Sequence, residues 1–224
     1  MDGLQPEQQL QKADAKKKVA LVIGAGDATG GEIAKRFARG GYIACMTRRN
    51  AEKLQPLIAE IEAEGGFAYG FASDARKEDQ VIALVEEIEA NIGEIDVLVF
   101  NIGANVPCSI LEETARTYFK IWEMACFGAF LTGREVAKRM VVREHGSIIF
   151  TGATAGIRGA ANFAAFAGAK HALRALAQSM ARELGPKNIH VAHVVVDGAI
   201  DTDFIKDTFP DMYARKEQDG ILNP

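Results

Sequence analysis

The sequence predicts an α/β protein in which helices cover both faces of a doubly wound parallel sheet, within a single domain. From residue 18 onward, short apolar runs alternate with longer segments whose apolar residues recur at helical spacing. This alternation is typical of parallel sheets wrapped by helices. The chain has 224 residues, 48% of them hydrophobic, which suffices for one large buried core. No linker or internal repeat divides this pattern, so one continuous βα series is expected.

Each element follows from its own local pattern. Six apolar runs flanked by Gly, Asp or Asn are predicted to be strands, at 19–23, 42–46, 67–72, 97–100, 147–150 and 190–195. The segments of helical periodicity between them predict helices at 32–39, 51–64, 78–91, 112–143 and 163–184.

The two ends of the chain differ from the core domain, which is expected to span 17–202. Residues 1–16 are polar and rich in Gln without an apolar segment, which predicts a loose leader rather than a secretory signal. After Val196 isolated aromatic residues are mixed with Asp, Gly and Pro, so residues 203–224 are predicted to form a substrate loop or lid without a further strand. The apolar residues in this segment predict one wall of an apolar pocket: Phe204, Ile205, Phe209 and Met212.

Composition excludes several classes of partner. Lys and Arg total 26 against 30 for Asp and Glu, a net charge of -4, so nucleic acid and anionic lipid are not favoured. No apolar run reaches the roughly 18 residues of a membrane span. Cys45, Cys108 and Cys126 are far apart and lack metal-site spacing, which favours reduced thiols in a cytoplasmic protein and no metal site.

A glycine-rich turn between the first strand and the first helix is the main candidate binding motif. Backbone amides can approach a pyrophosphate at a helix N-terminus only where side chains are small. The candidate contacts in this turn are Gly24, Gly26, Asp27, Ala28, Thr29 and Gly30. The alternative is a tight strand-to-helix connection that binds nothing.

Two arginines follow the second predicted strand, where the choice between NAD and NADP is made in dinucleotide-binding folds. An acidic residue there binds the ribose hydroxyls of NAD, whereas a basic one attracts the 2′-phosphate of NADP. Arg48 and Arg49 therefore favour NADP. The alternative is that both are solvated residues at the start of a helix, and Asp27 argues mildly against a nearby phosphate.

These motifs occur in the order found in short-chain dehydrogenase/reductases, and the chain resembles that family over residues 17–202. The resemblance implies a Rossmann-type fold, a nicotinamide dinucleotide, an alcohol or carbonyl substrate and a homodimer or homotetramer. It also implies further cofactor contacts: Asp74 and Ala75 at the adenine ring, Asn101, Ile102 and Gly103 beside the cofactor, Lys170 at the nicotinamide ribose, and Gly198, Ile200 and Thr202 near the carboxamide.

At the family's catalytic positions this chain departs from the usual residues. Family members that transfer hydride use an Asn, a Ser, a Tyr and a Lys; here the resemblance places Ala125, Ala153 and Phe166 at the first three positions and Lys170 at the fourth. Phenylalanine has no hydroxyl with which to exchange a proton, and losing a general acid costs roughly 10²–10⁴-fold in rate. Carbonyl reduction by the standard route is therefore expected to be compromised.

Other groups were weighed as replacements. Thr154 follows the Ser position directly and Thr151 ends the preceding strand, although a loop Thr ordinarily satisfies backbone groups. His171 follows Lys170 and is expected to point away from the cofactor because a helix turns by about 100° per residue. Asp197 is a further candidate for a substrate contact, with a turn role as its alternative.

Three hypotheses about function remain open at this point. The first is a family oxidoreductase with an altered proton route. The second is a non-catalytic NADP-binding sensor or scaffold, and the third is a folded relic without a ligand. NADPH binding separates the third from the others, and turnover separates the first from the second.

Overall fold

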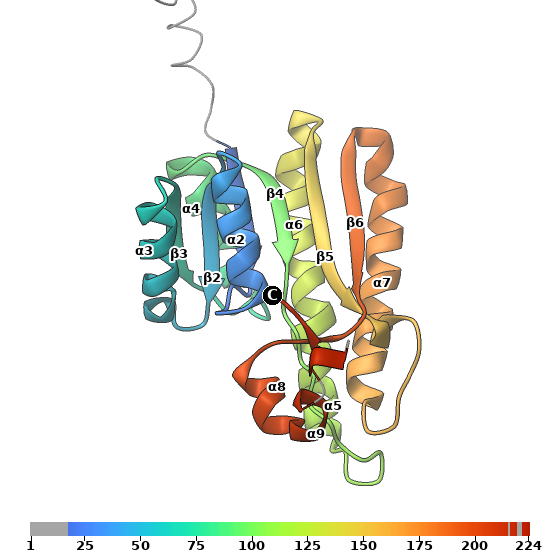
Figure 1. The fold of residues 1–224 in the computed structure, drawn as a ribbon. Coiled ribbons are helices and arrows are strands. Elements are labelled where there is room, and N and C mark those ends of the chain that lie inside the picture. The colour runs from blue at the N-terminus through green and yellow to red at the C-terminus, as the bar shows by residue number, and fades with distance from the viewer. Residues whose placement is uncertain (1–17, 215, 219–220) are drawn as a thin grey trace, which may run out of the picture.

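The computed structural model describes residues 18–214, 216–218 and 221–224, so the predicted leader, 1–16, lies outside the described residues. Six parallel strands form one sheet in the order β3-β2-β1-β4-β5-β6 (Figure 1). The strands are β1 (Lys18–Ile23), β2 (Ile43–Arg48), β3 (Phe67–Ala72), β4 (Glu94–Phe100), β5 (Gly146–Ala153) and β6 (Ile189–Val196). The predicted parallel α/β fold is confirmed.

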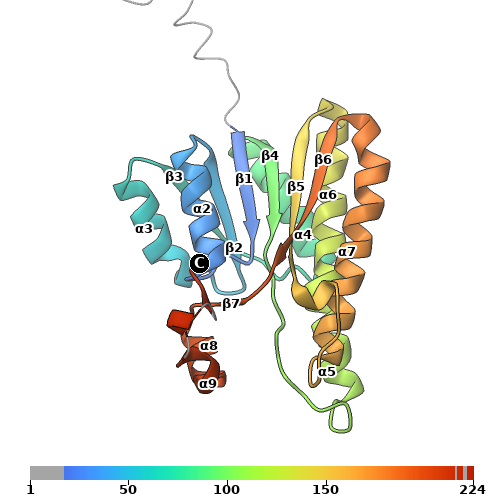
Figure 2. The same cartoon turned by 45° about the vertical axis from the view of Figure 1, so that its right-hand side comes forward.

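Helices cover both faces of this sheet, as Figures 1 and 2 show. On one face lie α2 (Thr29–Arg39) and α3 (Gln55–Ala63), which follows a short 3₁₀ turn, η1 (Ala51–Leu54). On the other face lie α4 (Glu78–Asn91), α6 (Gly128–Arg143) and α7 (Ala164–Leu184). β1, β2 and β4 are buried along almost their whole length. Strands buried on both faces are apolar throughout, which explains why the sequence shows apolar runs rather than alternation in these three strands.

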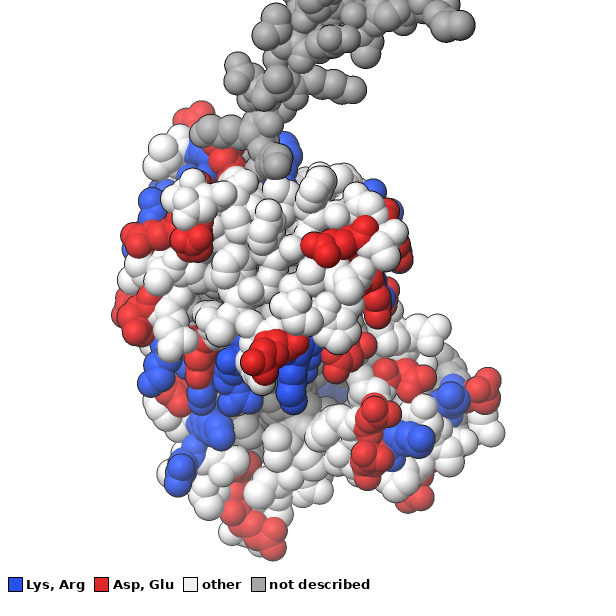
Figure 3. All heavy atoms as spheres, turned by 90° about the vertical axis from the view of Figure 1, so that its left-hand side faces the viewer, with Lys and Arg blue, Asp and Glu red and all other residues white. Residues whose placement is uncertain are grey.

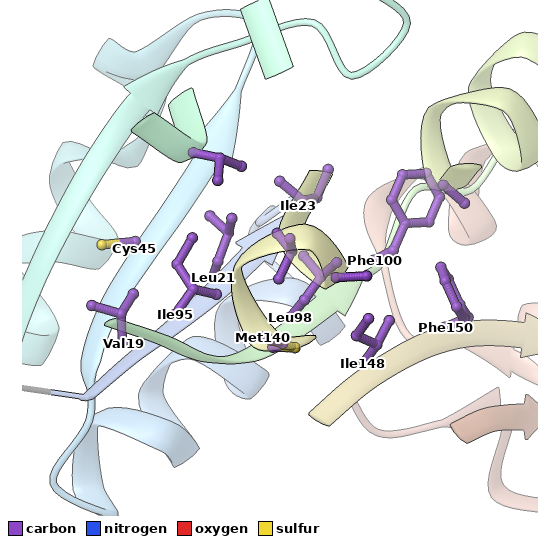
Figure 4. Close-up of a cluster of buried hydrophobic side chains, with 14 of the residues drawn as sticks. Val19, Leu21, Ile23, Cys45, Ile95, Leu98, Phe100, Met140, Ile148 and Phe150 are labelled. Carbon is purple, nitrogen blue, oxygen red and sulfur yellow. The ribbon is translucent and has the colours of Figure 1, made fainter. Parts of the chain in front are cut away.

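The largest apolar cluster fills the space between the sheet and the second helical layer (Figure 4). Its members include Val19, Leu21, Ile23, Cys45, Ile95, Leu98, Phe100, Met140, Ile148 and Phe150. Phe100 and Phe150 meet across β4 and β5 with ring centroids 6.5 Å apart. Burying one such side chain contributes roughly 1.5–3 kcal/mol, so the cluster holds the strands, and the strand ends that carry the site, in fixed positions.

The long helix predicted at 112–143 differs in two respects. It begins at Ala115, because the Thr114 hydroxyl accepts a hydrogen bond from the Thr117 amide and caps it. Its course is then interrupted between α5 (Ala115–Trp122) and α6 by a π-helical segment, η2 (Glu123–Phe127). Periodicity does not reveal such a segment, which adds one residue to a turn.

The C-terminal segment is more regular than the predicted loop. It forms two short helices, α8 (Asp203–Thr208) and α9 (Pro210–Tyr213), and the two-residue strand β8 (Ile221–Leu222), which pairs with β7 (Ala199–Ile200) outside the main sheet. The segment thus contains a short strand where no further strand was predicted, although this strand does not extend the main sheet. The two helices were not predicted because their start signals were missed: Thr202 caps α8 through the amide of Ile205, and Pro210 starts α9. The two helices lie beyond the C-terminal ends of the strands (Figure 1).

Within the described part of the chain, no helix has both the length and the apolar character needed to cross a membrane. The described residues also hold no group of His, Cys, Asp or Glu side chains suited to a metal ion. Cys45, Cys108 and Cys126 are all free thiols.

Candidate functional site

A cleft of about 640 Å³ lies at the C-terminal ends of the central strands. Its lining brings together the glycine turn after β1, the segment after β4, the end of β5, the N-terminal part of α7 and the segment that follows β6. Ligands of open parallel sheets bind at this edge, where neighbouring loops diverge. The expected apolar wall is also present, since Phe204, Ile205, Phe209 and Met212 all line the cleft.

The glycine turn is packed against the segment after β4. Gly24 has a positive φ of 84°, and a side chain on Gly30 would place Cβ 2.5 Å from the Gly24 carbonyl oxygen. The Asn101 side chain donates to that same carbonyl over 3.3 Å, which fixes the turn. Over Gly26, by contrast, an added Cβ meets no atom within 4 Å, so the turn leaves open room at the N-terminus of α2. These residues fit the pyrophosphate of a dinucleotide.

A second hollow, of about 200 Å³, lies beside the ends of β2 and β3 and includes Arg48, Arg49, Asp74, Ala75 and Arg76. Figure 3 shows Lys and Arg side chains, with acidic ones among them, gathered beside a depression on this side of the molecule. The Arg48 guanidinium forms an ion pair with Asp27 over 3.1 Å. Three guanidinium groups therefore face this end of the site.

Arg76 is a site residue that the sequence analysis missed. Its guanidinium contacts both oxygens of Asp74, with Nη2 2.6 Å from Oδ2 and Nε 2.9 Å from Oδ1. These hydrogen bonds from Arg76 lower the pKa of Asp74 below its ordinary value. The only available signal was an Arg two residues after an Asp, a spacing at which the Arg76 amide also donates to the Asp74 carboxylate in an Asx turn.

Lys170 lies at the opposite end of the cleft, where β5 meets α7. Its side chain is 3% exposed, and Nζ donates to the Thr151 carbonyl over 2.9 Å and to the Ile102 carbonyl over 3.2 Å. Burial lowers the pKa of Lys170 to about 8. The ammonium lies 5.8 Å from the centre of the Phe166 ring, so an aromatic face stands where the resemblance places a phenol.

The three positions that lack their polar residues belong to one apolar region. Ala125, in the π-helical segment, and Phe166 are buried in a common cluster, and Ala153 packs against it. A water molecule needs two to four polar partners, and alanine and phenylalanine side chains offer none. This part of the cleft therefore combines a buried cation with apolar walls.

A hydroxyl and a carboxylate meet on the neighbouring wall. The Thr154 hydroxyl donates to Oδ1 of Asp197, and both residues line the cleft. The Thr154 hydroxyl therefore bonds to a side chain 43 residues further along the chain, and not to the backbone of its own loop. His171 is exposed, and its Nδ1 lies 2.9 Å from the Ala167 carbonyl oxygen on its own helix.

The remaining candidates line the cleft in the expected order. They are Asp27, Ala28 and Thr29 in the turn, Ile102 and Gly103 after β4, and Gly198, Ile200 and Thr202 after β6. Thr151 lines the cleft as well, and its carbonyl serves as an acceptor for Lys170.

Comparison with known proteins defines the class to which this fold and site belong. The family model described as short chain dehydrogenase matches residues 18–212, and the chain belongs to that family. Its members are oxidoreductases that use NAD(H) or NADP(H), so the resemblance noted in the sequence is confirmed.

Individual relatives are moderately similar. The chain is 32% identical over 211 residues to a 2-dehydro-3-deoxy-D-gluconate 5-dehydrogenase of Formosa agariphila, covering 88% of this chain and 80% of the relative. A crystal structure of a short-chain dehydrogenase from Rhodopseudomonas palustris is 47% identical with a TM-score of 0.76, covering 92% of this chain and 98% of the other. NAD⁺-bound xylitol dehydrogenase is 28% identical with a TM-score of 0.82, covering 88% and 76%.

Proposed function

We propose that this protein is an NADP(H)-binding oxidoreductase of the short-chain dehydrogenase family that acts on an apolar alcohol or carbonyl compound without the family's standard Ser, Tyr and Asn chemistry. One observation carries the proposal: the glycine turn and the buried Lys170 open into the same cleft, where Ala153 and Phe166 supply only apolar groups. Ala125 is buried in the apolar cluster behind them. Residues 17–202 form the cofactor domain in this account, and 203–224 close the substrate end.

The preference for NADP over NAD rests on the second hollow. Arg48, Arg49 and Arg76 face it, against the single carboxylate of Asp74 in its lining. Guanidinium groups bind phosphate oxygens through paired, charge-assisted hydrogen bonds. Asp74 has a supporting part in this scheme, because it holds the Arg76 side chain in place.

At the nicotinamide end, Lys170 binds the cofactor and Phe166 excludes water. The bound dinucleotide supplies a hydride acceptor or donor. Lys170 offers its ammonium to the ribose, held by two backbone carbonyls. Phe166 shields that ammonium and packs against substrate but exchanges no proton, so the reacting oxygen depends on another group.

Assembly into a homodimer or homotetramer is part of the same proposal. Aromatic side chains on α5 and α6 reach the surface, with Phe119 57% and Phe130 37% exposed. Small residues on α7, among them Ala172 and Ala175, permit close approach of another helix. Sedimentation velocity would show a species at least twice the monomer mass of 24.2 kDa.

Turnover measured with and without restored groups tests the function. The natural chain would be assayed with NADPH and NADP⁺ on apolar carbonyl compounds and alcohols, beside a variant carrying Ala125→Asn, Ala153→Ser and Phe166→Tyr. Detectable turnover by the natural chain, increased in the restored variant on carbonyl reduction, is the expected result. Turnover by the restored variant alone would favour the sensor or scaffold, a function that the apolar lining of the site also suits. Absence of NADPH binding in calorimetry would refute both.

A further inference from the structure

A hydroxyl–carboxylate pair stands at the end of two neighbouring strands. β5 and β6 are paired in parallel up to Ala153 and Val196, so the next residue of each strand, Thr154 and Asp197, emerges at the same edge of the sheet. The Thr154 hydroxyl donates to the Asp197 carboxylate. Both side chains line the cleft that holds Phe166 and Lys170.

Among the charged side chains of the cleft, Asp197 is the best placed to exchange a proton. The cleft lining contains Asp27, Arg158, Lys170 and Asp197 as its charged residues. Asp27 is paired with Arg48 at the glycine turn, and an arginine does not give up its proton in proteins. Lys170 is 3% exposed and already donates to two carbonyls. Asp197 is exposed, so a proton that it accepts passes directly to water.

A purely structural role explains this pair less well. A hydrogen bond to a solvent-exposed carboxylate contributes little to stability, because water competes for both partners. The cleft that the pair lines also has apolar side chains in its lining, among them Phe163, Phe209 and Met212. A hydroxyl that is polarised by a carboxylate and lines a cleft of this kind is suited to a substrate with an apolar body and one polar oxygen.

We propose that Thr154 and Asp197 form a proton relay for the oxidation of an apolar secondary alcohol, an inference that rests on the proposed function. The substrate O–H bond breaks and its proton passes to Oγ1 of Thr154, while the proton of Thr154 passes to the Asp197 carboxylate and on to water. The substrate C–H bond would break with its electron pair, and the family's oxidised dinucleotide, when bound, would supply the hydride acceptor. The product is a ketone. Thr154 is the catalytic residue, since it touches substrate, and Asp197 acts through it.

The direction of the hydrogen bond gives the relay a preference between alcohol and ketone. While Asp197 is ionised it accepts only, so the single proton of Thr154 points toward Asp197. The lone pairs of Thr154 then remain free for the O–H of an alcohol. A ketone offers no donor and would set its oxygen against those lone pairs. The pair therefore selects the alcohol form of the substrate.

Calorimetry on non-reacting complexes tests this selection without turnover. Cyclohexanol would be titrated into the protein saturated with NADPH, and cyclohexanone into the protein saturated with NADP⁺. Thr154→Val is expected to weaken cyclohexanol binding about 10-fold, the equivalent of one hydrogen bond, and to leave cyclohexanone unchanged or tighter. Thr154→Ser retains the hydroxyl and should restore the natural value. Asp197→Asn, whose amide can also donate to Thr154, should weaken the alcohol and strengthen the ketone.

Two control variants and three possible results test the relay. Thr208→Val and Asp207→Asn, on exposed positions of α8, should leave both affinities unchanged. Equal changes in alcohol and ketone affinity in Thr154→Val would show a structural brace and overturn the relay. A natural chain that binds NADPH but not cyclohexanol would overturn it too. Failure to bind NADPH would instead remove the proposed function itself.

Discussion

Two glycines of the same turn should differ in how much stability they lose when replaced by alanine. At Gly30, an added Cβ would lie 2.5 Å from the Gly24 carbonyl oxygen and 2.8 Å from Ala25 Cα, both of them backbone atoms that cannot move aside cheaply. Overpacking of this kind costs roughly 1–3 kcal/mol. At Gly26 no atom lies within 4 Å of the added Cβ, so Gly26→Ala should change the free energy of unfolding by less than about 0.5 kcal/mol.

Cofactor binding should separate the two variants further. The open space over Gly26 is where we place the pyrophosphate, so a methyl group there displaces it from the backbone amides. Loss of a single hydrogen bond to a charged group, about 1.5–3 kcal/mol, corresponds to a fall of roughly 10–150-fold in NADPH affinity. Gly26→Ala would therefore be a stable protein that binds NADPH poorly, whereas Gly30→Ala would lose stability as well.

The assay combines urea unfolding with calorimetric titration of NADPH. Gly185→Ala is the matched control, since its added Cβ also meets no atom within 4 Å and the residue lies at the far end of α7. Natural affinity in Gly26→Ala would refute the placement of the pyrophosphate. An unchanged unfolding midpoint in Gly30→Ala would refute the packing argument.

Three further predictions concern charged groups. Arg76→Gln should weaken NADPH binding about 10-fold or more and leave NADH binding nearly unchanged, because only NADPH carries the 2′-phosphate. Paired titrations would measure both affinities, with the exposed Arg36→Gln as control. Equal losses for both cofactors would contradict a role of Arg76 at the 2′-phosphate. Burial lowers the pKa of Lys170 from its ordinary 10.5 to about 8. Between these two values the unfolded chain binds a proton that the folded chain does not, so the free energy of unfolding should rise as pH increases from 8 to 10.5. Lys170→Met should remove that rise in urea unfolding; if the rise persists in the variant, another group causes it. Burial alone would raise the pKa of Asp96, but hydrogen bonds from Tyr42, Lys18 and His145 lower it below its ordinary 3.8. The stabilisation that Asp96 contributes is therefore present above that value and is lost as pH falls through the folded-state pKa. Asp96→Asn should make the free energy of unfolding less dependent on pH in this acid range, and an unchanged dependence would contradict this role.

The fold was predictable because buried parallel strands appear in the sequence as short, continuous apolar runs. The apolar runs of β1 and β4 and the glycines between β1 and α2 need no knowledge of partners. Local signals also existed for α8, where Thr202 caps the helix, but a mixed stretch of Asp, Pro and aromatic residues obscured them. Element boundaries at such places depend on a few hydrogen bonds rather than on periodicity.

Apart from Arg76, the parts of the site that sequence reasoning missed are contacts between residues that it had already named. Thr154 and Asp197 lie 43 residues apart and meet only because β5 and β6 are paired in a particular register. The ion pair of Arg48 with Asp27 joins two different βα turns in the same way. A single sequence names the candidate side chains but not the sheet register that brings them together.

We propose that this chain retains the dinucleotide site of its family while Thr154 and Asp197 replace the missing proton-handling groups. A crystal structure of the complex with NADP⁺ and cyclohexanol would test it most directly. We predict the pyrophosphate over Gly26, the nicotinamide ribose at Lys170 and the alcohol oxygen within hydrogen-bond distance of Thr154 Oγ1. A cofactor bound elsewhere, or an alcohol oxygen held by a different side chain, would contradict the account.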